Sequence, residues 1–252
     1  MHHDRLWLPG HIALDLQYDL PRASGITFIL SSGYGNDQFH EAAQLVLIDV
    51  LKQHDIGWVQ YVYPERCPAN AFTDLYISTG VSTLMWMYDW LRRRESGKIC
   101  LFGYSFGGNI SIEIALVRQL HALILLNPVF EYGEYRRQQL GMAAIKEWRR
   151  TKVIDLFYDG QPYPLGYRFL QEAERQDLEK RAASVNCEVH AFQAENDAIL
   201  TPRAISGLAQ ASTLWEAHVV PGENADHNFE HTEALDRLRA SLGPIVSSIA
   251  EG

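Results

Sequence analysis

Four short, nearly continuous apolar runs are the feature of this sequence that most restricts its fold. They cover residues 26–30, 58–62, 99–102 and 122–126. Strands of a parallel sheet have this character because helices cover both of their faces. The stretches that follow the first three runs have helical character, and they cover residues 39–53, 77–93 and 108–118. The sequence therefore predicts an α/β fold with a mostly parallel central sheet flanked by helices.

Two segments depart from this alternation. Residues 12–18 alternate apolar with polar side chains, which predicts a half-exposed antiparallel strand. Residues 129–177 are rich in Tyr, Arg and Gln, with a helix expected at 136–152 and a turn at 159–162. We expect this interruption to be a lid inserted into a single domain of residues 1–252, and ordinary peripheral helices are the alternative. The pattern then resumes and ends with a helix expected at 232–250.

A G-x-S-x-G motif lies between one apolar run and the helical stretch that follows it. The motif is Gly103-Tyr104-Ser105-Phe106-Gly107. A serine on a tight strand-to-helix turn points outward at the end of the sheet, with its backbone N–H at the positive end of a helix. The small flanking glycines suit this turn because backbone and neighbouring side chains approach closely there. The motif predicts that Ser105 is a catalytic nucleophile.

A serine nucleophile needs a base that is oriented by an acid, and in this architecture the order along the chain is Ser, acid, His. Asp197 lies in a loop after the predicted strand 188–193, and His227 lies in a loop after the predicted strand 215–220. The order and the strand-end positions both match. We therefore expect Asp197 to be the acid and His227 the base.

Rival residues stand close to each of these positions. Glu195 and Asp226 are the rival acids, and His231 is the rival base. We expect Glu195 to lie on the strand and Asp226 to be too near His227 in sequence to face its ring. His231 is expected to begin the final helix.

The oxyanion hole is expected to use two backbone N–H groups. The first belongs to Phe106, the residue after the nucleophile. The second belongs to Tyr34 in the loop 31–35, where Gly33 and Gly35 let the backbone turn its amide inward. A glycine-rich turn with no catalytic role is the alternative.

Neither a cofactor nor a metal is expected. A G-x-G turn at residues 33–35 lacks the further residues of a phosphate-binding loop. The residues of the acidic and histidine-containing loop near the C-terminus lack regular ligand spacing; they are Glu223, Asp226, His227 and His231. The proposed triad already accounts for His227.

Composition narrows the class of protein. The net charge of −9 argues against a nucleic-acid-binding protein. Cys67, Cys100 and Cys187 are widely spaced and odd in number, which favours reduced thiols over a disulfide framework. Residues 1–5 lack the apolar region of a signal peptide, and no apolar run approaches the length of a membrane span. A cytoplasmic protein is therefore expected.

Together these motifs resemble the α/β-hydrolases over nearly the whole chain. Within that fold the chain is most similar to the bacterial acyl-carrier-protein thioesterases, the acyl transferases that supply myristate to luminescence systems. The segments that carry this resemblance are 32–34, 72–80, 88–91, 158–166, 195–197 and 226–227. At the nucleophile, that family resembles A-x-S-x-A, whereas this chain has G-x-S-x-G. The resemblance implies the roles of nucleophile, acid and base for Ser105, Asp197 and His227.

The expected function is hydrolysis or transfer of an acyl group from a carrier-protein or coenzyme A thioester. The alternatives are a carboxylesterase or acyltransferase that acts on a small ester, and a catalytically silent binding module with this fold. Residues 136–152 carry six basic residues against one acidic residue, and we expect Arg136, Arg137, Arg149 and Arg150 to form a docking surface for an acidic acyl carrier protein. The solvated face of an amphipathic helix is the alternative, with Leu140, Ala144 and Trp148 turned inward.

Overall fold

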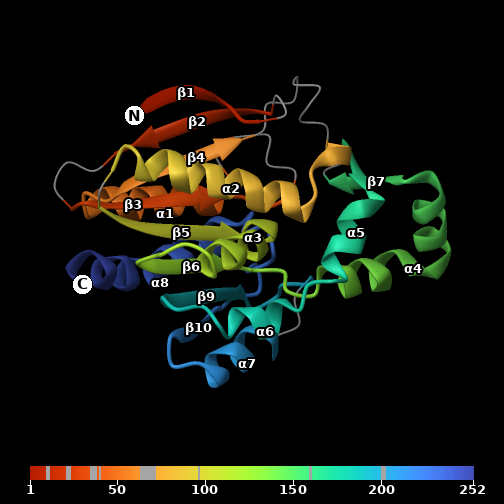
Figure 1. The fold of residues 1–252 in the computed structure, drawn as a ribbon. Coiled ribbons are helices and arrows are strands. Elements are labelled where there is room, and N and C mark those ends of the chain that lie inside the picture. The colour runs from red at the N-terminus through yellow and green to blue at the C-terminus, as the bar shows by residue number, and fades with distance from the viewer. Residues whose placement is uncertain are drawn as a thin grey trace.

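The computed structural model describes residues 1–9, 12–20, 24–34, 39, 41–62, 72–95, 97–158, 161–199 and 203–252. Within them, eight strands form one sheet; they are β1 (His2–Trp7), β2 (Ala13–Asp19), β3 (Ile26–Ser31), β4 (Gly57–Val62), β5 (Lys98–Tyr104), β6 (Ala122–Leu126), β9 (Glu188–Ala194) and β10 (Trp215–Val220). Their order across the sheet is β1-β2-β4-β3-β5-β6-β9-β10 (Figure 1). The pairs β1–β2 and β2–β4 are antiparallel, and all others are parallel. The predicted mostly parallel sheet is confirmed.

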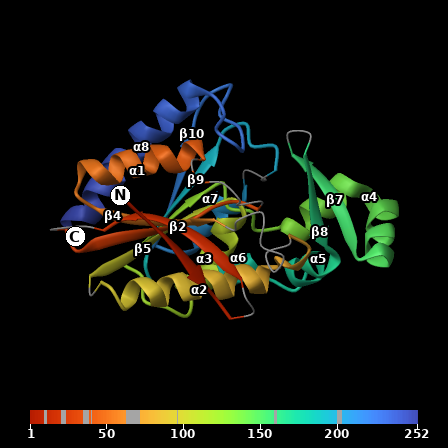
Figure 2. The same ribbon diagram turned by 90° about the horizontal axis from the view of Figure 1, so that it is seen from above.

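Helices cover both faces of the sheet (Figure 2). Their bounds are α1 (Ala42–Gln53), α2 (Ile77–Arg92), α3 (Phe106–Ala115), α4 (Tyr132–Thr151), α5 (Tyr167–Ala173), α6 (Leu178–Ala182), α7 (Arg203–Ala211) and α8 (Thr232–Glu251), with a short 3₁₀ turn at Phe72–Asp74. α1 and α8 lie side by side on one face, and α2 and α3 lie on the other. The apolar side chains of β3, β4, β5, β6 and β9 alternate between two cores, one under each helical layer. This double burial explains the continuous apolar runs of the parallel strands.

β2 is antiparallel as predicted, but the prediction that it is half-exposed is wrong. Leu14 and Leu16 are buried on one face, and Ala13 and Gln17 are buried as well. β1 covers the outer edge of β2, and the side-chain amide of Gln60 donates a hydrogen bond to the side-chain oxygen of Gln17. A buried glutamine is tolerated when its polar atoms are paired in this way.

The segment 129–177 contributes elements that lie beyond one end of the sheet, to the right in Figures 1 and 2. α4 begins at Tyr132, earlier than expected, and breaks at Gly141, whose φ of 75° and ψ of 164° are not helical. Where the sequence indicated a turn, an antiparallel hairpin forms from β7 (Val153–Tyr158) and β8 (Gln161–Gly166); residues 159 and 160 lie outside the described part. That this segment is a lid stays a prediction.

The structure describes two of the three cysteines that were expected to be reduced thiols. Cys100 and Cys187 are buried free thiols, and Cys67 lies outside the described residues. Burial raises the pKa of Cys187 to about 12 and raises the pKa of Cys100 as well, so both thiols stay protonated.

In the described part of the chain, every helix is too short or too polar to cross a bilayer.

Candidate active site

Ser105 occupies the turn between β5 and α3. The strand ends at Tyr104, the helix begins at Phe106, and Ser105 has a φ of 52° and a ψ of −116°. A positive φ is strained for a residue with a Cβ atom, and such strain persists only where the surrounding structure enforces it. The turn holds Ser105 at the carboxyl end of the sheet and at the N-terminus of α3.

The glycines of the motif are required by close packing. A Cβ atom on Gly107 would lie 2.1 Å from the backbone oxygen of Ser31 at the end of β3. A Cβ atom on Gly103 would lie 2.7 Å from the backbone oxygen of Gly107. Both distances are shorter than a van der Waals contact, so a larger residue at either position would push the turn away from the sheet.

Asp197, His227 and Ser105 form a continuous chain of hydrogen-bonding distances. The Nε2 atom of His227 lies 2.9 Å from the Oγ atom of Ser105, and its Nδ1 atom lies 2.7 Å from the Oδ2 atom of Asp197. The Asp197 side chain is fully buried, and its Oδ1 atom accepts a hydrogen bond of 2.7 Å from the backbone N–H of Ile199. Because a carboxylate only accepts, Nδ1 carries the imidazole proton and the Nε2 lone pair faces the serine hydroxyl. The structure thus brings together the three residues predicted from the sequence.

Two further residues, which the sequence did not reveal, hold the His227 loop. The hydroxyl of Tyr104 donates a hydrogen bond of 2.7 Å to the backbone oxygen of His227. Burial raises the pKa of Tyr104 well above its usual value, so the phenol remains a donor. Asn127 donates to the same oxygen at 2.9 Å and accepts from the backbone N–H of Ala194 at 2.8 Å. Asn127 therefore ties the loop that carries His227 to the end of β9, the strand that precedes Asp197.

The rival residues have other partners. β9 ends at Ala194, so Glu195 lies just beyond the strand and not on it as expected; its carboxylate accepts from the backbone N–H of Gly222 at 2.7 Å. Asp226 accepts from the backbone N–H of Phe229 at 2.8 Å. His231 is the exposed residue at the start of α8. Each rival therefore lies in a hydrogen-bonded loop or at a helix start, outside the Ser105–His227–Asp197 chain.

The two residues expected to form the oxyanion hole, Phe106 and Tyr34, both lie close to Ser105. Phe106 is the first residue of α3, where backbone N–H groups lack helical partners. A Cβ atom on Gly33 would lie 3.5 Å from the Cβ atom of Ser105, so the loop after β3 passes close to Ser105. The Tyr34 ring packs edge-on against Phe106, with 6.0 Å between centroids. Gly35 lies outside the described residues.

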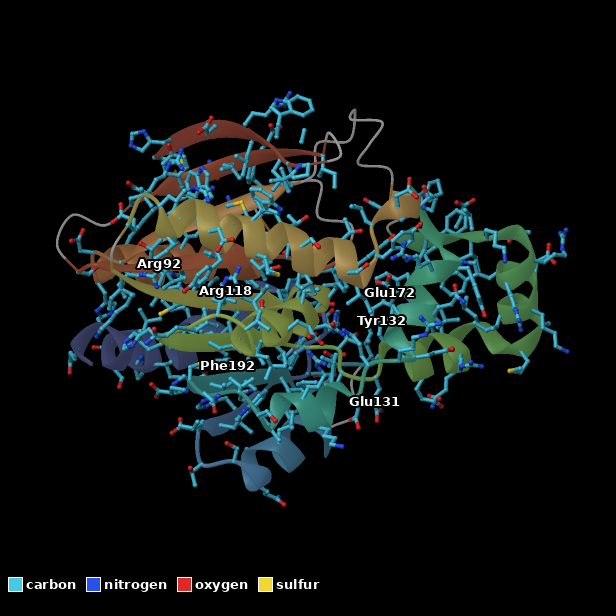
Figure 3. All side chains as sticks on the ribbon, in the orientation of Figure 1. Arg92, Arg118, Glu131, Tyr132, Glu172 and Phe192 are labelled. Carbon is cyan, nitrogen blue, oxygen red and sulfur yellow. The ribbon has the colours of Figure 1, made fainter. Side chains whose placement is uncertain are left out.

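A cleft of about 620 Å³ opens beside Ser105 and His227. Five tyrosines contribute to its lining, namely Tyr34, Tyr104, Tyr132, Tyr135 and Tyr163. Figure 3 labels Tyr132 where α4 meets the end of the sheet. Tyr132 and Tyr135 come from α4 and Tyr163 comes from β8, so the segment 129–177 forms one wall of the cleft.

Arg136 also lines this cleft, and its burial corrects its assignment to an exposed docking surface. It is 3% exposed, and its guanidinium lies over the rings of Tyr132 and Tyr135, at 4.8 and 5.1 Å from their centroids. It donates hydrogen bonds to the hydroxyl of Tyr132 and the side-chain oxygen of Gln139. The cation is therefore turned toward the cleft and away from the surface.

The other three arginines of the expected docking surface are less buried than Arg136. Arg137 forms an ion pair with Glu174, and Arg150 forms one with Glu147. Arg149 is exposed on the second half of α4. The two ion pairs reduce the positive field that the sequence implied. The inward face of this half carries the buried Ile145 and Trp148, whereas Leu140 and Ala144 are only half-buried, because the break at Gly141 changes the face that the helix presents.

Comparison with known proteins identifies the fold. No protein-family model and no curated protein matches the sequence. The solved structure of Est1E from Butyrivibrio proteoclasticus matches with a TM-score of 0.79 and 16% identity over 99% of both chains. Alpha/beta hydrolase domain-containing protein 10 from mouse matches with a TM-score of 0.76 and 14% identity, over 99% of this chain and 100% of that one. The chain has the α/β-hydrolase fold.

An esterase domain from a Rhodothermus marinus protein has the same fold, with a TM-score of 0.70 and 16% identity over 98% of each chain. At these identities the likeness defines the architecture alone. In an α/β-hydrolase fold the carboxyl ends of the central strands carry the active site. Ser105, Asp197 and His227 all follow such ends, after β5, β9 and β10. The luminescence thioesterases are one branch of this fold, and membership of that branch stays a prediction.

Proposed function

We propose that this protein is a serine hydrolase that cleaves an acyl ester or thioester through an acyl-enzyme on Ser105. The observation that carries the proposal is the hydrogen-bonded chain from Asp197 through His227 to Ser105 on the strained turn. A serine hydroxyl is a weak nucleophile unless a neighbouring base takes its proton. The lone pair of His227 Nε2, 2.9 Å from Oγ, is suited to that task.

The reaction proceeds in two halves. Ser105 Oγ attacks the carbonyl carbon, its proton passes to His227 Nε2, and the carbonyl electron pair moves to the oxygen. The backbone N–H groups of Phe106 and Tyr34 stabilise that oxyanion. Collapse of the intermediate breaks the bond to the alcohol or thiol, which receives the proton from His227. Water then repeats the sequence on the acyl-enzyme and releases the acid, while Asp197 stabilises the imidazolium.

A thioester on an acyl carrier protein or coenzyme A is the first candidate substrate. The resemblance of segments such as 72–80 and 195–197 to the acyl-carrier-protein thioesterases supports it. Arg149 on α4, with the ion-paired Arg137 and Arg150, would attract the acidic carrier to this helix. In this scheme the segment 129–177 acts as a lid over the acyl group.

A compact carboxylic ester is the second candidate, and the lining of the cleft favours it. Aromatic rings with hydroxyl groups and the buried cation of Arg136 suit an aryl or anionic group better than a long alkyl chain. Ferulic acid, an aromatic acid, has been found bound to Est1E, which shares the fold at 16% identity. By this reasoning the acyl group is short, and the leaving group is an alcohol.

Matched substrates separate the two candidates. The same acyl groups, from acetyl to decanoyl, are offered as coenzyme A thioesters, as carrier-protein thioesters and as p-nitrophenyl esters, and kcat/KM is measured for each. A thioesterase prefers the carrier-bound series at equal chain length, and an esterase of compact substrates prefers the short esters. A binding module without catalysis would turn over none of them, and that result would refute the proposed function.

A further inference from the structure

Two adjacent strands carry the same E-x-H pattern within their first four residues. β9 begins Glu188-Val189-His190, and β10 contains Glu216-Ala217-His218. The two strands are parallel, and Glu216 pairs with His190. Because side chains alternate along a strand, the four Glu and His side chains lie on one face of the sheet.

Three ligand-type atoms of this cluster form a nearly equilateral triangle. His190 Nδ1 lies 3.3 Å from His218 Nε2 and 3.4 Å from the Oε2 atom of Glu216. His218 Nε2 lies 3.6 Å from the same oxygen. Zinc bonds of about 2.0–2.2 Å in tetrahedral geometry place pairs of ligand atoms about 3.3–3.6 Å apart. The triangle therefore has the dimensions of one face of a zinc tetrahedron.

The environment of His190 fixes the ring for ligation. Its side chain is 4% exposed, and its Nε2 atom lies 2.9 Å from the Oε1 atom of Glu188. A carboxylate accepts the Nε2 proton and leaves the Nδ1 lone pair directed at His218 and Glu216. A histidine ligand whose other nitrogen donates to a carboxylate is the usual arrangement in protein zinc sites.

His218 and Glu216 complete the cluster on its open side. The His218 ring stacks on Phe192, with 4.7 Å between centroids and 22° between planes, and Figure 3 labels Phe192 on β9. The side chains of His218 and Glu216 are 27% and 64% exposed. An ion can therefore enter from solvent, and a water molecule can occupy the fourth position.

We propose that His190, His218 and Glu216 form a Zn²⁺ site that joins β9 to β10. β10 is the last strand in the sheet order, with a neighbour on one side only among the described strands. Asp197 and His227 follow the carboxyl ends of these same strands. The metal thus stabilises the support of the triad and takes no part in the acyl transfer. A direct hydrogen bond from His218 to His190, with no ion bound, is the arrangement that the test must distinguish.

Zinc titration of the full chain, freed of metal by a chelator that is then removed, tests the site. We expect one Zn²⁺ per chain by calorimetry, no binding of Mg²⁺, which prefers oxygen ligands, and a rise in Tm with zinc concentration. His218→Gln and Glu216→Gln should each weaken zinc binding by more than about tenfold and remove the rise in Tm. Glu188→Gln should weaken zinc binding as well, by about 10- to 100-fold, because Glu188 orients the ring of the ligand His190.

The histidines at the N-terminus supply the matched control, because His2 and His3 are exposed on β1. The double variant H2Q/H3Q should bind zinc as the unmodified chain does. Absence of binding by the unmodified chain at micromolar zinc would overturn the proposal. So would binding that survives both His218→Gln and Glu216→Gln, or binding that the control variant abolishes. Circular dichroism of each variant shows that it is folded.

Discussion

At the residue scale, the assignment of Asp197 as the acid is the part of the proposed triad that most needs a test. Asp197→Asn removes the carboxylate that orients His227 and favours its charged form, and it should lower kcat roughly 10⁴-fold with little change in KM. Asp226→Asn is the matched control, because Asp226 is adjacent to His227 in sequence but accepts from the backbone of Phe229. It should retain most of the activity. A larger loss of kcat in Asp226→Asn than in Asp197→Asn would show that Asp197 is not the acid.

Tyr104 is expected to act as a positioning residue through the backbone of His227. Tyr104→Phe removes one hydrogen bond to the His227 oxygen and leaves that from Asn127, so kcat should fall about 2- to 10-fold while KM stays unchanged. Tyr88→Phe is the control, because its hydroxyl donates a similar bond of 2.9 Å to Gln119, remote from the site. Equal effects of the two variants on kcat would show that Tyr104 contributes only to stability.

The hydrogen-bonded chain of Ser105, His227 and Asp197 could be predicted from the sequence because each residue follows a strand in the order that the architecture requires. Tyr104, Asn127 and Arg136 could not. The bonds from Tyr104 and Asn127 to His227 span 123 and 100 positions of the sequence, and no short pattern predicts them. Arg136 belongs to a charged stretch that reads as a solvated helix face. Its burial depends on the aromatic rings of Tyr132 and Tyr135, which only the folded helix places beneath it.

At the scale of elements, the turn between β5 and α3 and the loop after β3 make different demands on their glycines. Gly107→Ala places a Cβ atom 2.1 Å from the Ser31 oxygen, and it should lower the free energy of unfolding by more than about 2 kcal/mol. Gly33→Ala has its nearest atom at 3.5 Å, so it should fold normally. Its methyl group lies beside Ser105 and should reduce kcat/KM by crowding the substrate.

Thermal melting and steady-state kinetics of both glycine variants check this contrast. A Gly107→Ala variant as stable as the unmodified chain would show that the turn can relax. Full activity of the Gly33→Ala variant would show that the substrate does not bind next to Gly33.

The elements that the sequence predicted well are those whose pattern is local. The parallel strands could be recognised as continuous apolar runs because both faces are buried. β1 could not, because its residues are polar and mostly exposed, and its place depends on pairing with β2. The E-x-H repeats of β9 and β10 are 28 residues apart, and only the register of the two strands makes them one cluster. The sequence did not predict the hairpin of β7 and β8, because β8 contains two prolines and proline is unusual within a strand.

At the scale of the whole molecule, charge would govern an encounter with the proposed carrier protein. A chain of net charge −9 repels an acidic carrier except where cations gather. Arg149→Glu on α4 should raise KM for a carrier-bound thioester by about two- to tenfold at low salt and leave a small uncharged ester unaffected. Arg93→Glu, just past α2, carries the same charge change at a different exposed position. Equal effects of the two variants on KM would show that the net charge of the chain matters and that α4 is not a docking surface.

The most direct test of the central claim is covalent labelling of Ser105. A fluorophosphonate reacts with a serine only where a base activates it and an oxyanion hole receives the phosphoryl oxygen. Intact-mass analysis should find one adduct per chain, peptide mapping should place it on Ser105, and hydrolytic activity should fall in proportion. Ser105→Ala should take up no label, remain folded and lose roughly 10⁶-fold in kcat. An unlabelled chain, or a Ser105→Ala variant that keeps its label or its activity, would contradict the account.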